Sequence, residues 1–237
     1  MNDKIQMTKQ RAKIKEIFSS IQGEGIYLGV PQIFVRFDGC NTDCLYCDEK
    51  KKPAKFDLTV QELVKKIKAL DKKSGPHHSV SLTGGEPLVH KEFLGSLLPR
   101  LKAAGYKIYL ETNGTLPDNL KAVLKKIDIV AADIKLPSAT KNKSFWQEHE
   151  ESLKAAGPKA FVKVIATKDT KKEDIKKAVE LVKKIDPKMP FVIQPSTGNG
   201  KFKAPDNKRL FEYKKLAAKS LKDVRIIPRV HKIIGVR

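Results

Sequence analysis

The chain contains three cysteines, and all of them lie within one short run, at Cys40, Cys44 and Cys47. Thiolates are ligands for iron–sulfur clusters and for zinc. The spacing C-x3-C-x2-C favours a cubane 4Fe-4S cluster, because three thiolates can hold three corners and leave one iron open to an outside ligand. A zinc site completed by a histidine and buried free thiols are the alternatives. The odd number of cysteines disfavours structural disulfides.

Strand-like apolar runs alternate with stretches of helical period along most of the chain. The strand-like runs are QIFVRFDG, HSVSLTGG, YKIYLET, DIVAADIK, AFVKVIAT, PFVIQP and DVRIIP. One helical stretch follows Thr59, which forms a candidate capping box with Glu62. The others lie near residues 91–104, 117–126, 171–185 and 205–220. Strands that are apolar on both faces and alternate with helices indicate parallel β/α units. Six or seven such units predict one α/β domain built as a barrel or part of one.

Polar residues gather where the predicted strands end. These groups are the cysteine loop, Thr83 to Pro87, Glu111 to Gly114, Asp133 to Lys135, and Gln194 with Pro195. The carboxyl ends of parallel strands meet at one edge of a sheet, where β/α enzymes carry their reactive groups. We therefore expect one shared mouth that contains the cysteines.

The chain is strongly basic, with 48 Lys and Arg against 27 Asp and Glu and a net charge of +21. The excess is mostly lysine scattered over helix-like stretches, without an Arg-rich block or a basic run interleaved with aromatic residues. This pattern favours solvated helix faces and anionic small molecules over nucleic acid. No apolar run approaches the length of a membrane span, and the charged N-terminus lacks an export signal. We therefore expect a cytoplasmic protein.

Two motifs together resemble the radical S-adenosylmethionine (radical SAM) enzymes. The cysteine loop carries an aromatic residue, Tyr46, before its last cysteine, and GGEP follows the next strand-like run at Gly84–Pro87. The resemblance implies a partial (β/α)6 barrel with mostly parallel strands. It also implies a 4Fe-4S cluster whose open iron binds S-adenosyl-L-methionine. We expect residues 1–237 to form a single radical SAM domain whose C-terminal tail closes the mouth.

Longer stretches resemble one family, the 7-carboxy-7-deazaguanine synthases. They are EIFSSIQGEGIYLGVPQIFVRFDGCNTDC, LTGGEPL, LETNGT, DIKLPS, IQP and IPRVHKIIGVR, and they cover nearly the whole chain. The resemblance implies conversion of 6-carboxy-5,6,7,8-tetrahydropterin to 7-carboxy-7-deazaguanine by radical ring contraction with loss of ammonia, in queuosine-type 7-deazapurine biosynthesis. It further implies a homodimer and an electron donor such as flavodoxin or ferredoxin.

The resemblance also implies roles for individual residues. Cys40, Cys44 and Cys47 would hold the cluster. The residues expected to bind S-adenosylmethionine are Tyr46, Asp48, Gly84, Gly85, Glu86, Glu111, Asn113, Asp133 and Lys135. The residues expected to bind the pterin are Gln22, Gly23, Glu24, Arg36, Thr83, Gln194 and His231. Among the last group, a carboxylate can read the guanidine-like edge of the ring, and the Arg36 fork suits the substrate carboxylate.

One position departs from the family pattern. These synthases place Thr or Ser two residues after the last cysteine, where the hydroxyl helps to hold Mg2+, and this chain has Glu49 there. A glutamate can bind a hard cation, but its charge would repel the substrate carboxylate. The sequence therefore assigns no metal ligand outside the cluster, and it leaves the Mg2+ requirement open.

Two other functions fit part of the sequence. A radical SAM activase of a glycyl radical enzyme would share the cysteine loop but would not need Gln22, Glu24, Arg36 and His231. A zinc-containing nucleic-acid binder would use the three thiols and the positive charge. Iron and sulfide analysis separates the zinc protein from either enzyme.

Overall fold

The computed structural model describes residues 10–49, 53–141, 143–197 and 203–236. Within these ranges the strands form one sheet in the order β3-β1-β2-β4-β5-β6-β7-β8-β9. The strands are β1 (Arg11–Ile21), β2 (Pro31–Phe37), β3 (Phe56–Thr59), β4 (Ser79–Gly84), β5 (Ile108–Thr112), β6 (Ile129–Ile134), β7 (Ala160–Ala166), β8 (Phe191–Pro195) and β9 (Val224–Ile226). Each neighbouring pair from β2 to β9 is parallel, whereas β1 runs antiparallel to both β2 and β3.

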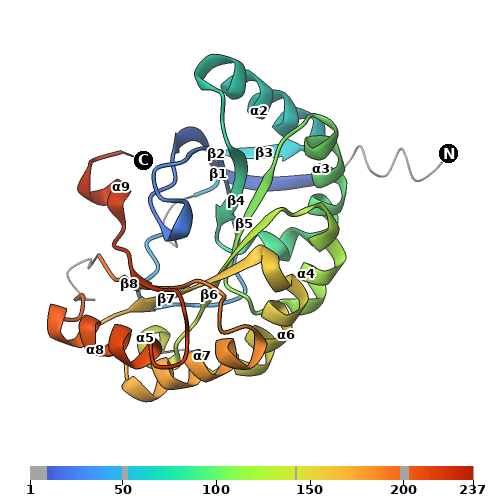
Figure 1. Cartoon of the computed structure of the whole chain (residues 1–237). Coiled ribbons are helices and arrows are strands. Elements are labelled where there is room, and N and C mark those ends of the chain that lie inside the picture. Colours follow the sequence, from blue (N-terminus) through green and yellow to red (C-terminus); the bar gives the residue numbers. More distant parts are fainter. Residues whose placement is uncertain (1–9, 50–52, 142, 198–202, 237) are drawn as a thin grey trace.

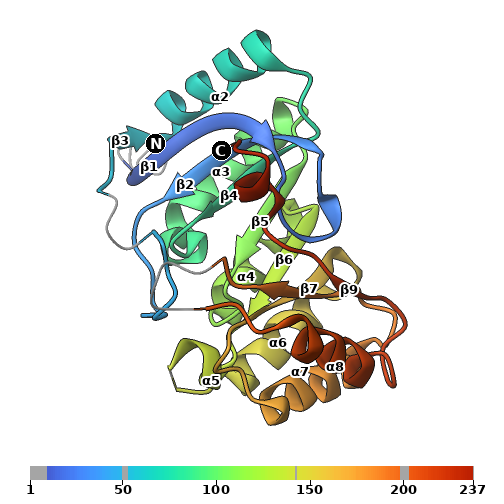
Figure 2. The same ribbon diagram turned by 90° about the vertical axis from the view of Figure 1, so that its left-hand side faces the viewer.

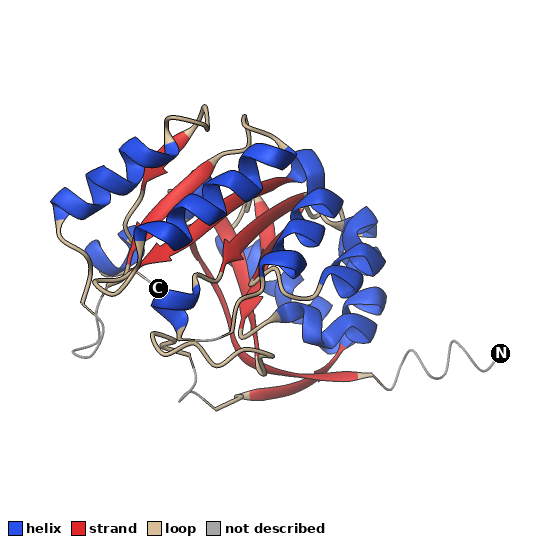
Figure 3. Cartoon of the chain, turned by 90° about the horizontal axis from the view of Figure 1, so that it is seen from below, coloured by secondary structure: helices blue, strands red, loops and turns tan. Residues whose placement is uncertain are grey.

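The sheet is curved, and helices cover its outer face while the inner face stays open on one side (Figures 1 and 3). The helices are α2 (Val60–Ser74), α3 (Lys91–Ala103), α4 (Pro117–Val123), α5 (Pro137–Thr140), α6 (Trp146–Ala156), α7 (Lys172–Ile185), α8 (Asn207–Ala217) and α9 (Val230–Ile233). Short 3-10 turns occur at η1 (Gly25–Tyr27), η2 (Pro87–His90), η3 (Leu124–Lys126) and η4 (Gly157–Lys159). The mostly parallel partial barrel expected from the sequence is confirmed.

The core fills the space between the sheet and the outer helices. Every residue of β6 is buried, as expected for a parallel strand that is covered on both faces. Leu63 of α2, Leu94 of α3 and Val182 of α7 are fully buried in the same apolar cluster as the strands. Burial of one such side chain contributes about 1.5–3 kcal/mol. The helices therefore fix the strands whose ends carry the polar groups.

The predicted capping box at the start of α2 is confirmed. The backbone N–H of Glu62 donates to Thr59 Oγ1 (3.3 Å), and the backbone N–H of Thr59 donates to the Glu62 carboxylate (2.7 Å). These bonds satisfy donors that a helix N-terminus otherwise leaves unpaired.

Apart from the four-residue helices α5 and α9 and the short 3-10 turns, three elements were not among the predicted ones: β1, β3 and α6. Residues Arg11 to Ile14 of β1 alternate between exposed and buried, the period of a strand with one solvated face. The predicted strands were found as runs that are apolar on both faces. β1 and β3, at one edge of the sheet, do not have such a run. α6 carries charged side chains over most of its exposed face, which hid its shorter apolar stripe.

The C-terminal segment leaves β9 and crosses the open side of the sheet to α9 (Figures 1 and 2). There the backbone N–H of Val230 donates to the carbonyl oxygen of Gly23, in the loop after β1 (3.0 Å). Segments from the two ends of the chain thus meet at the mouth. Among the described residues, the structure has no helix that is both long enough and apolar enough to cross a membrane.

Candidate active site

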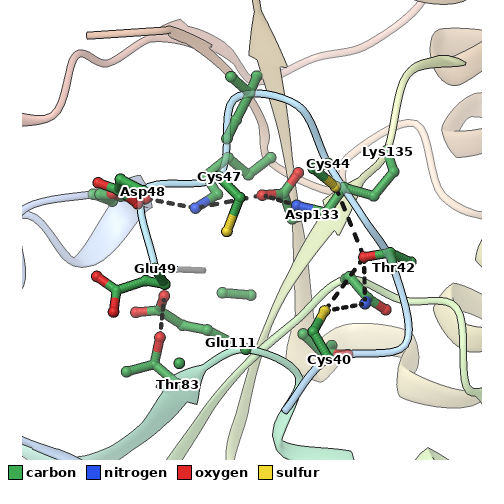
Figure 4. A pocket seen from close by; sticks show the side chains of 18 of the residues that line it. Cys40, Thr42, Cys44, Cys47, Asp48, Glu49, Thr83, Glu111, Asp133 and Lys135 are labelled. Atoms are coloured by element: carbon green, nitrogen blue, oxygen red, sulfur yellow. Dashed lines mark hydrogen bonds and ion pairs between the residues drawn. The ribbon is translucent and has the colours of Figure 1, made fainter. Parts of the chain in front are cut away.

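A pocket opens at the carboxyl ends of the parallel strands (Figure 4). Its walls come from the cysteine loop after β2, from the ends of β4 to β8, and from the C-terminal segment. It brings together these predicted residues: Glu24, Arg36, Cys40, Cys44, Tyr46, Cys47, Asp48, Thr83, Gly84, Gly85, Glu111, Asn113, Asp133, Lys135 and Gln194. An adjoining hollow adds Gln22, Gly23 and His231 and shares Glu24, Arg36, Thr83 and Glu111. The shared mouth predicted from the strand ends is confirmed.

The cysteine loop places its three thiols, none of which forms a disulfide, along one side of the pocket (Figure 4). Thr42 Oγ1 lies 3.4 Å from Cys40 Sγ and 3.7 Å from Cys44 Sγ, so one hydroxyl links two of the thiols. The backbone N–H of Cys47 donates to the carbonyl oxygen of Cys44 (3.2 Å). Burial raises the pKa of the Cys44 thiol, and the positive charge of Lys135 opposes that rise.

These residues fit the cluster that the radical SAM family uses. A cubane takes one thiolate at each of three irons, and the three thiols of this one loop line the same pocket. Lys135 supplies a positive charge that favours the thiolate form of Cys44. The described part of the chain contains no group of three His, Cys, Asp or Glu side chains placed to hold a single metal ion.

The glycines after β4 are required by packing of the backbone. A Cβ on Gly85 would lie 1.9 Å from the carbonyl oxygen of Gly39, and one on Gly84 would lie 2.3 Å from that of Phe37. Gly84 also has φ +119°, a conformation that favours glycine. The N–H of Gly85 donates to the carbonyl oxygen of Phe37 (3.1 Å). The turn therefore packs against the segment that leads into Cys40 and holds it in place. This packing explains the two glycines, and the sequence alone did not indicate it.

Glu86 is the one predicted site residue that lines neither the pocket nor the hollow. Its carboxylate is fully buried and accepts hydrogen bonds from the N–H groups of Leu88 (3.0 Å) and Asn113 (2.6 Å) and from the Thr112 hydroxyl (2.9 Å). Burial raises its pKa to about 7, against the effect of those donors. In this structure its side chain holds the loop after β5 under the pocket and does not face the cofactor space.

Asp133 and Lys135, at the end of β6, form an ion pair in the pocket wall. Lys135 Nζ lies 3.0 Å from Asp133 Oδ2, and both side chains are only 12% exposed. Lys135 Nζ also sits 5.7 Å from the centre of the Tyr46 ring, close enough for a cation–π contact. Burial lowers the pKa of Lys135, but the neighbouring Asp133 carboxylate raises it well above its usual range. Lys135 therefore keeps its charge, and the pair belongs to the pocket, not to the surface.

Glu24 is held between two cations at the other end of the pocket. Lys163 Nζ lies 2.5 Å from Glu24 Oε2, and Arg229 Nε donates to Glu24 Oε1 (3.0 Å). Burial alone would raise the pKa of Glu24, but Lys163 and Arg229 hold it far below its usual range. Lys163 Nζ also lies 3.8 Å from Asp133 Oδ2. Burial lowers the pKa of Lys163, but the carboxylates of Glu24 and Asp133 raise it above its usual range. Glu24 is thus an ionised acceptor of fixed orientation.

The hollow beside Glu24 is built around Gln22. The Gln22 amide donates to Gln32 Oε1 and to Glu111 Oε1 (both 3.1 Å), and its oxygen accepts from the N–H of Glu24 (3.0 Å). The Thr83 hydroxyl donates to Glu111 Oε2 (3.0 Å). Both amide hydrogens of Gln22 are therefore engaged within the protein, and its carbonyl oxygen keeps one accepting position.

His231 packs directly on Gly23. A Cβ at Gly23 would lie 2.1 Å from His231 Nδ1, so glycine at this position permits the C-terminal segment to dock. Burial lowers the pKa of His231, and the charges of Arg229 and Lys232 add to that effect. The imidazole is neutral at pH 7 and lines the hollow.

Arg36 lies between two carboxylates. Its Nε is 3.3 Å from Glu16 Oε2, and its Nη1 is 3.7 Å from Glu49 Oε1. Glu49 is buried, and the guanidinium lies against its charge. Since Arg36 has five N–H donors, these contacts leave donors that can face the pocket.

Several residues that line this site have no role predicted from the sequence, among them Thr42, Lys163 and Arg229. Thr42 lies within the cysteine loop and was passed over between the thiols. Lys163 lies in the strand-like run AFVKVIAT and has no role predicted from the sequence, although a lysine inside a buried strand is a signal for a paired charge. Arg229 stands in IPRVHKIIGVR two residues before His231, and only the histidine was singled out.

Comparisons with known proteins agree with this geometry. The radical SAM superfamily profile matches residues 34–192. A 7-carboxy-7-deazaguanine synthase from Geobacter sulfurreducens is 33% identical over 97% of this chain and 99% of its own length. The enzyme of that name from Methanothermobacter thermautotrophicus is 35% identical over 98% of this chain and 100% of its own.

Solved structures share the fold. The crystal structure of QueE from Escherichia coli superimposes with a TM-score of 0.65, at 21% identity over 96% of this chain and 98% of that one. A radical SAM methyltransferase from Sphaerobacter thermophilus gives a TM-score of 0.63 at 11% identity, over 84% of this chain and 66% of that one. The near full-length sequence likeness and the cysteine-lined pocket together show that the chain belongs to the 7-carboxy-7-deazaguanine synthase family of the radical SAM superfamily.

Proposed function

We propose that the protein converts 6-carboxy-5,6,7,8-tetrahydropterin to 7-carboxy-7-deazaguanine with release of ammonia. The observation that carries this proposal is one continuous pocket, lined by Cys40, Cys44 and Cys47 at one end and by Glu24 and Gln194 at the other. A pterin ring bound by Glu24 and Gln194 would therefore share one pocket with a cluster held by the three cysteines. The cluster and S-adenosylmethionine, when bound, supply the one-electron chemistry that abstracts hydrogen from carbon.

The chain's own residues would bind and orient the pterin. Glu24 is ionised and can accept from adjacent N–H groups of the guanidine-like edge. Gln194 Oε1 is buried without a hydrogen-bond partner among the described residues, and a buried acceptor of this kind is stabilised when a donor arrives. Arg36 keeps guanidinium donors for the substrate carboxylate. His231 is neutral at pH 7, so its ring has one nitrogen that can donate a hydrogen bond and one that can accept a hydrogen bond from a pterin in the hollow.

The cofactor residues would act mainly through backbone and fixed charge. Gly84 and Gly85 present main chain at the pocket wall beside Cys40. Asp133 Oδ1 is buried and has no hydrogen-bond partner among the described residues, so it can accept from a bound cofactor. Lys163 holds its proton tightly, and we assign it to orient Glu24 and not to act as a general acid.

The test is anaerobic incubation of the reconstituted protein with pterin, S-adenosylmethionine and a reductant. We expect a new deazapurine chromophore and equimolar ammonia. An intact cluster without that product contradicts the proposal. The same assay with added Mg2+ or chelator, on the wild type and on Glu49→Thr, addresses the metal. Arg36 already lies against the Glu49 carboxylate, so we expect the wild type to respond less to Mg2+ than the threonine variant.

The family also supports finer proposals about the protein's surroundings. These are a flavodoxin- or ferredoxin-type electron donor, a homodimer with one pocket in each subunit, and a cytoplasmic location. Light scattering of the purified protein tests the dimer, because a mass near twice 26.6 kDa is expected and a mass near 26.6 kDa would contradict it. Product formation driven by purified flavodoxin and its reductase tests the donor.

A further inference from the structure

Arg229 joins three segments that lie far apart in the sequence. Its Nε donates to Glu24 Oε1 (3.0 Å), in the loop after β1, and its Nη2 donates to Asp48 Oδ2 (2.9 Å), in the cysteine loop. Its Nη1 donates to Thr197 Oγ1 (3.1 Å), after β8. A single guanidinium therefore ties the C-terminal segment to the loop after β1, to the cysteine loop and to the segment after β8.

The backbone next to Arg229 is fixed independently of that side chain. The N–H of Val230 donates to the carbonyl oxygen of Gly23, and the His231 ring packs on Gly23. These contacts hold the C-terminal segment against the hollow on one side. The Arg229 side chain then extends from the hollow into the pocket and lines both. It lies between the predicted pterin end and the cysteine loop.

The chemistry of the two carboxylates differs. The Glu24 carboxylate pairs with Lys163 as well as with Arg229, so it still has a positively charged partner when its contact with Arg229 changes. Asp48 follows Cys47 directly, and Arg229 Nη2 lies 2.9 Å from its carboxylate, so a change at Arg229 acts directly on the cysteine loop. A planar guanidinium can donate in three directions at once, whereas a lysine ammonium on a flexible stem is a single point charge. The arrangement therefore requires arginine.

We propose that Arg229 is a positioning residue through which pterin binding at Glu24 orders the cysteine loop at Asp48. This inference rests on the proposed function, because it takes Glu24 to be a pterin contact. A pterin that donates to Glu24 competes with Arg229 Nε for the same carboxylate and moves the guanidinium toward Asp48 and Thr197. The cysteine loop is held more firmly as a result. By reciprocity, the ordered loop strengthens pterin binding.

The test measures cluster loss from the reconstituted holoenzyme. A ferrous chelator is added under anaerobic conditions without S-adenosylmethionine, and the decay of the cluster absorbance is followed with and without 6-carboxy-5,6,7,8-tetrahydropterin. For the wild type we expect the pterin to slow the loss roughly fivefold or more, the low end of typical coupling between two sites. For Arg229→Met and Asp48→Asn we expect the pterin to have no such effect.

Two further variants keep the test decisive. Arg229→Lys retains the charge without the fork, and we expect less than half of the wild-type slowing. Arg225→Met is the matched control, because Arg225 lies on β9 and pairs with Asp223 at the surface (2.7 Å). We expect it to respond to the pterin as the wild type does. If Arg229→Met loads no cluster, Arg229→Lys and Asp48→Asn decide the question.

The outcomes separate this inference from the function on which it rests. Slowing in the wild type that persists in Arg229→Met, Arg229→Lys and Asp48→Asn overturns the inference and leaves the function intact. A wild type that forms the deazapurine without any protection by the pterin also overturns it. A wild type that shows neither protection nor product overturns the proposed function itself.

Discussion

The two ends of the pocket are built in different ways. At the cysteine end, three thiols lie within eight residues, and the glycine turn after β4 clamps their loop through main-chain contacts. At the other end, Glu24, Lys163 and Arg229 form a partly buried ion-pair network, in which Lys163 and Arg229 lie 139 and 205 residues from Glu24. The first end depends on local geometry, whereas the second depends on the complete fold. The difference indicates that altering one end should abolish the function of that end and leave the other in place, with Arg229 coupling the strength of the two.

The largest effect is expected at the cysteine end. Replacement of any one of Cys40, Cys44 and Cys47 by alanine should abolish iron binding and product formation, because a cubane held by two thiolates is lost. Iron and sulfide analysis after anaerobic reconstitution checks this result. The pterin end should survive, so the variant should still bind the pterin in equilibrium dialysis. Retention of a full complement of iron in all three variants would contradict the assignment.

The opposite pattern is expected from Glu24→Gln. This change keeps the shape but removes the anion that Lys163 and Arg229 orient toward the pterin, and loss of charge-assisted hydrogen bonds to the bound pterin costs about 3 kcal/mol. We therefore expect kcat/KM for the pterin to fall on the order of 100-fold, with cluster content unchanged. Glu150→Gln is the matched control. That glutamate pairs with Lys154 and Lys184 on the outer face of α6, where such pairs contribute little.

The cysteine end of the pocket could be predicted from the sequence, whereas much of the Glu24 end could not. The cysteine spacing, the glycine turn and the strand ends are short signals, and parallel strands bring them together without further information. The ion-pair network has no local signature. Lys163 looks like one polar residue in a strand, and Arg229 becomes meaningful only when the C-terminal segment crosses to Glu24. The GGEP motif predicts a loop whose backbone approaches the cofactor, but it cannot show that the Glu86 carboxylate turns inward to Thr112 and Asn113.

A pH dependence should expose the inward role of Glu86. Its pKa is about 7 in the folded chain against an ordinary 4.5, so the folded state keeps a proton that the unfolded state releases between those values. The stabilisation is fully present below about pH 4.5 and is lost as the pH rises through about 7. A shift of this size corresponds to about 3 kcal/mol at most.

The measurement is urea unfolding of the cluster-free protein, comparing the wild type with Glu86→Gln, which cannot titrate. The difference in the free energy of unfolding should decrease as the pH rises from 5 to 7. A difference that stays constant over that window would contradict the buried, protonated state of Glu86.

The smallest of these effects should come from Gly85→Ala. The new Cβ would meet the carbonyl oxygen of Gly39, so the turn must shift, at a cost of about 2 kcal/mol in unfolding free energy. Gly95→Ala is the control, because its Cβ meets nothing within 4 Å in α3, and alanine should stabilise that helix by about 0.5–1 kcal/mol. Gly85→Ala should also slow cluster loading. Equal stability of the two variants would show that the turn is not a clamp.

The claim that the two ends face one another across a single reaction space has a direct test. The reconstituted enzyme is incubated anaerobically with reductant, S-adenosylmethionine and 6-carboxy-5,6,7,8-tetrahydropterin deuterated at C6. The deazapurine base and the compounds that carry the 5′-deoxyadenosyl group are then analysed by mass spectrometry. The account predicts 7-carboxy-7-deazaguanine, with deuterium appearing in the 5′-deoxyadenosyl group. Cleavage of S-adenosylmethionine without deuterium transfer or deazapurine, at full cluster content, would contradict it.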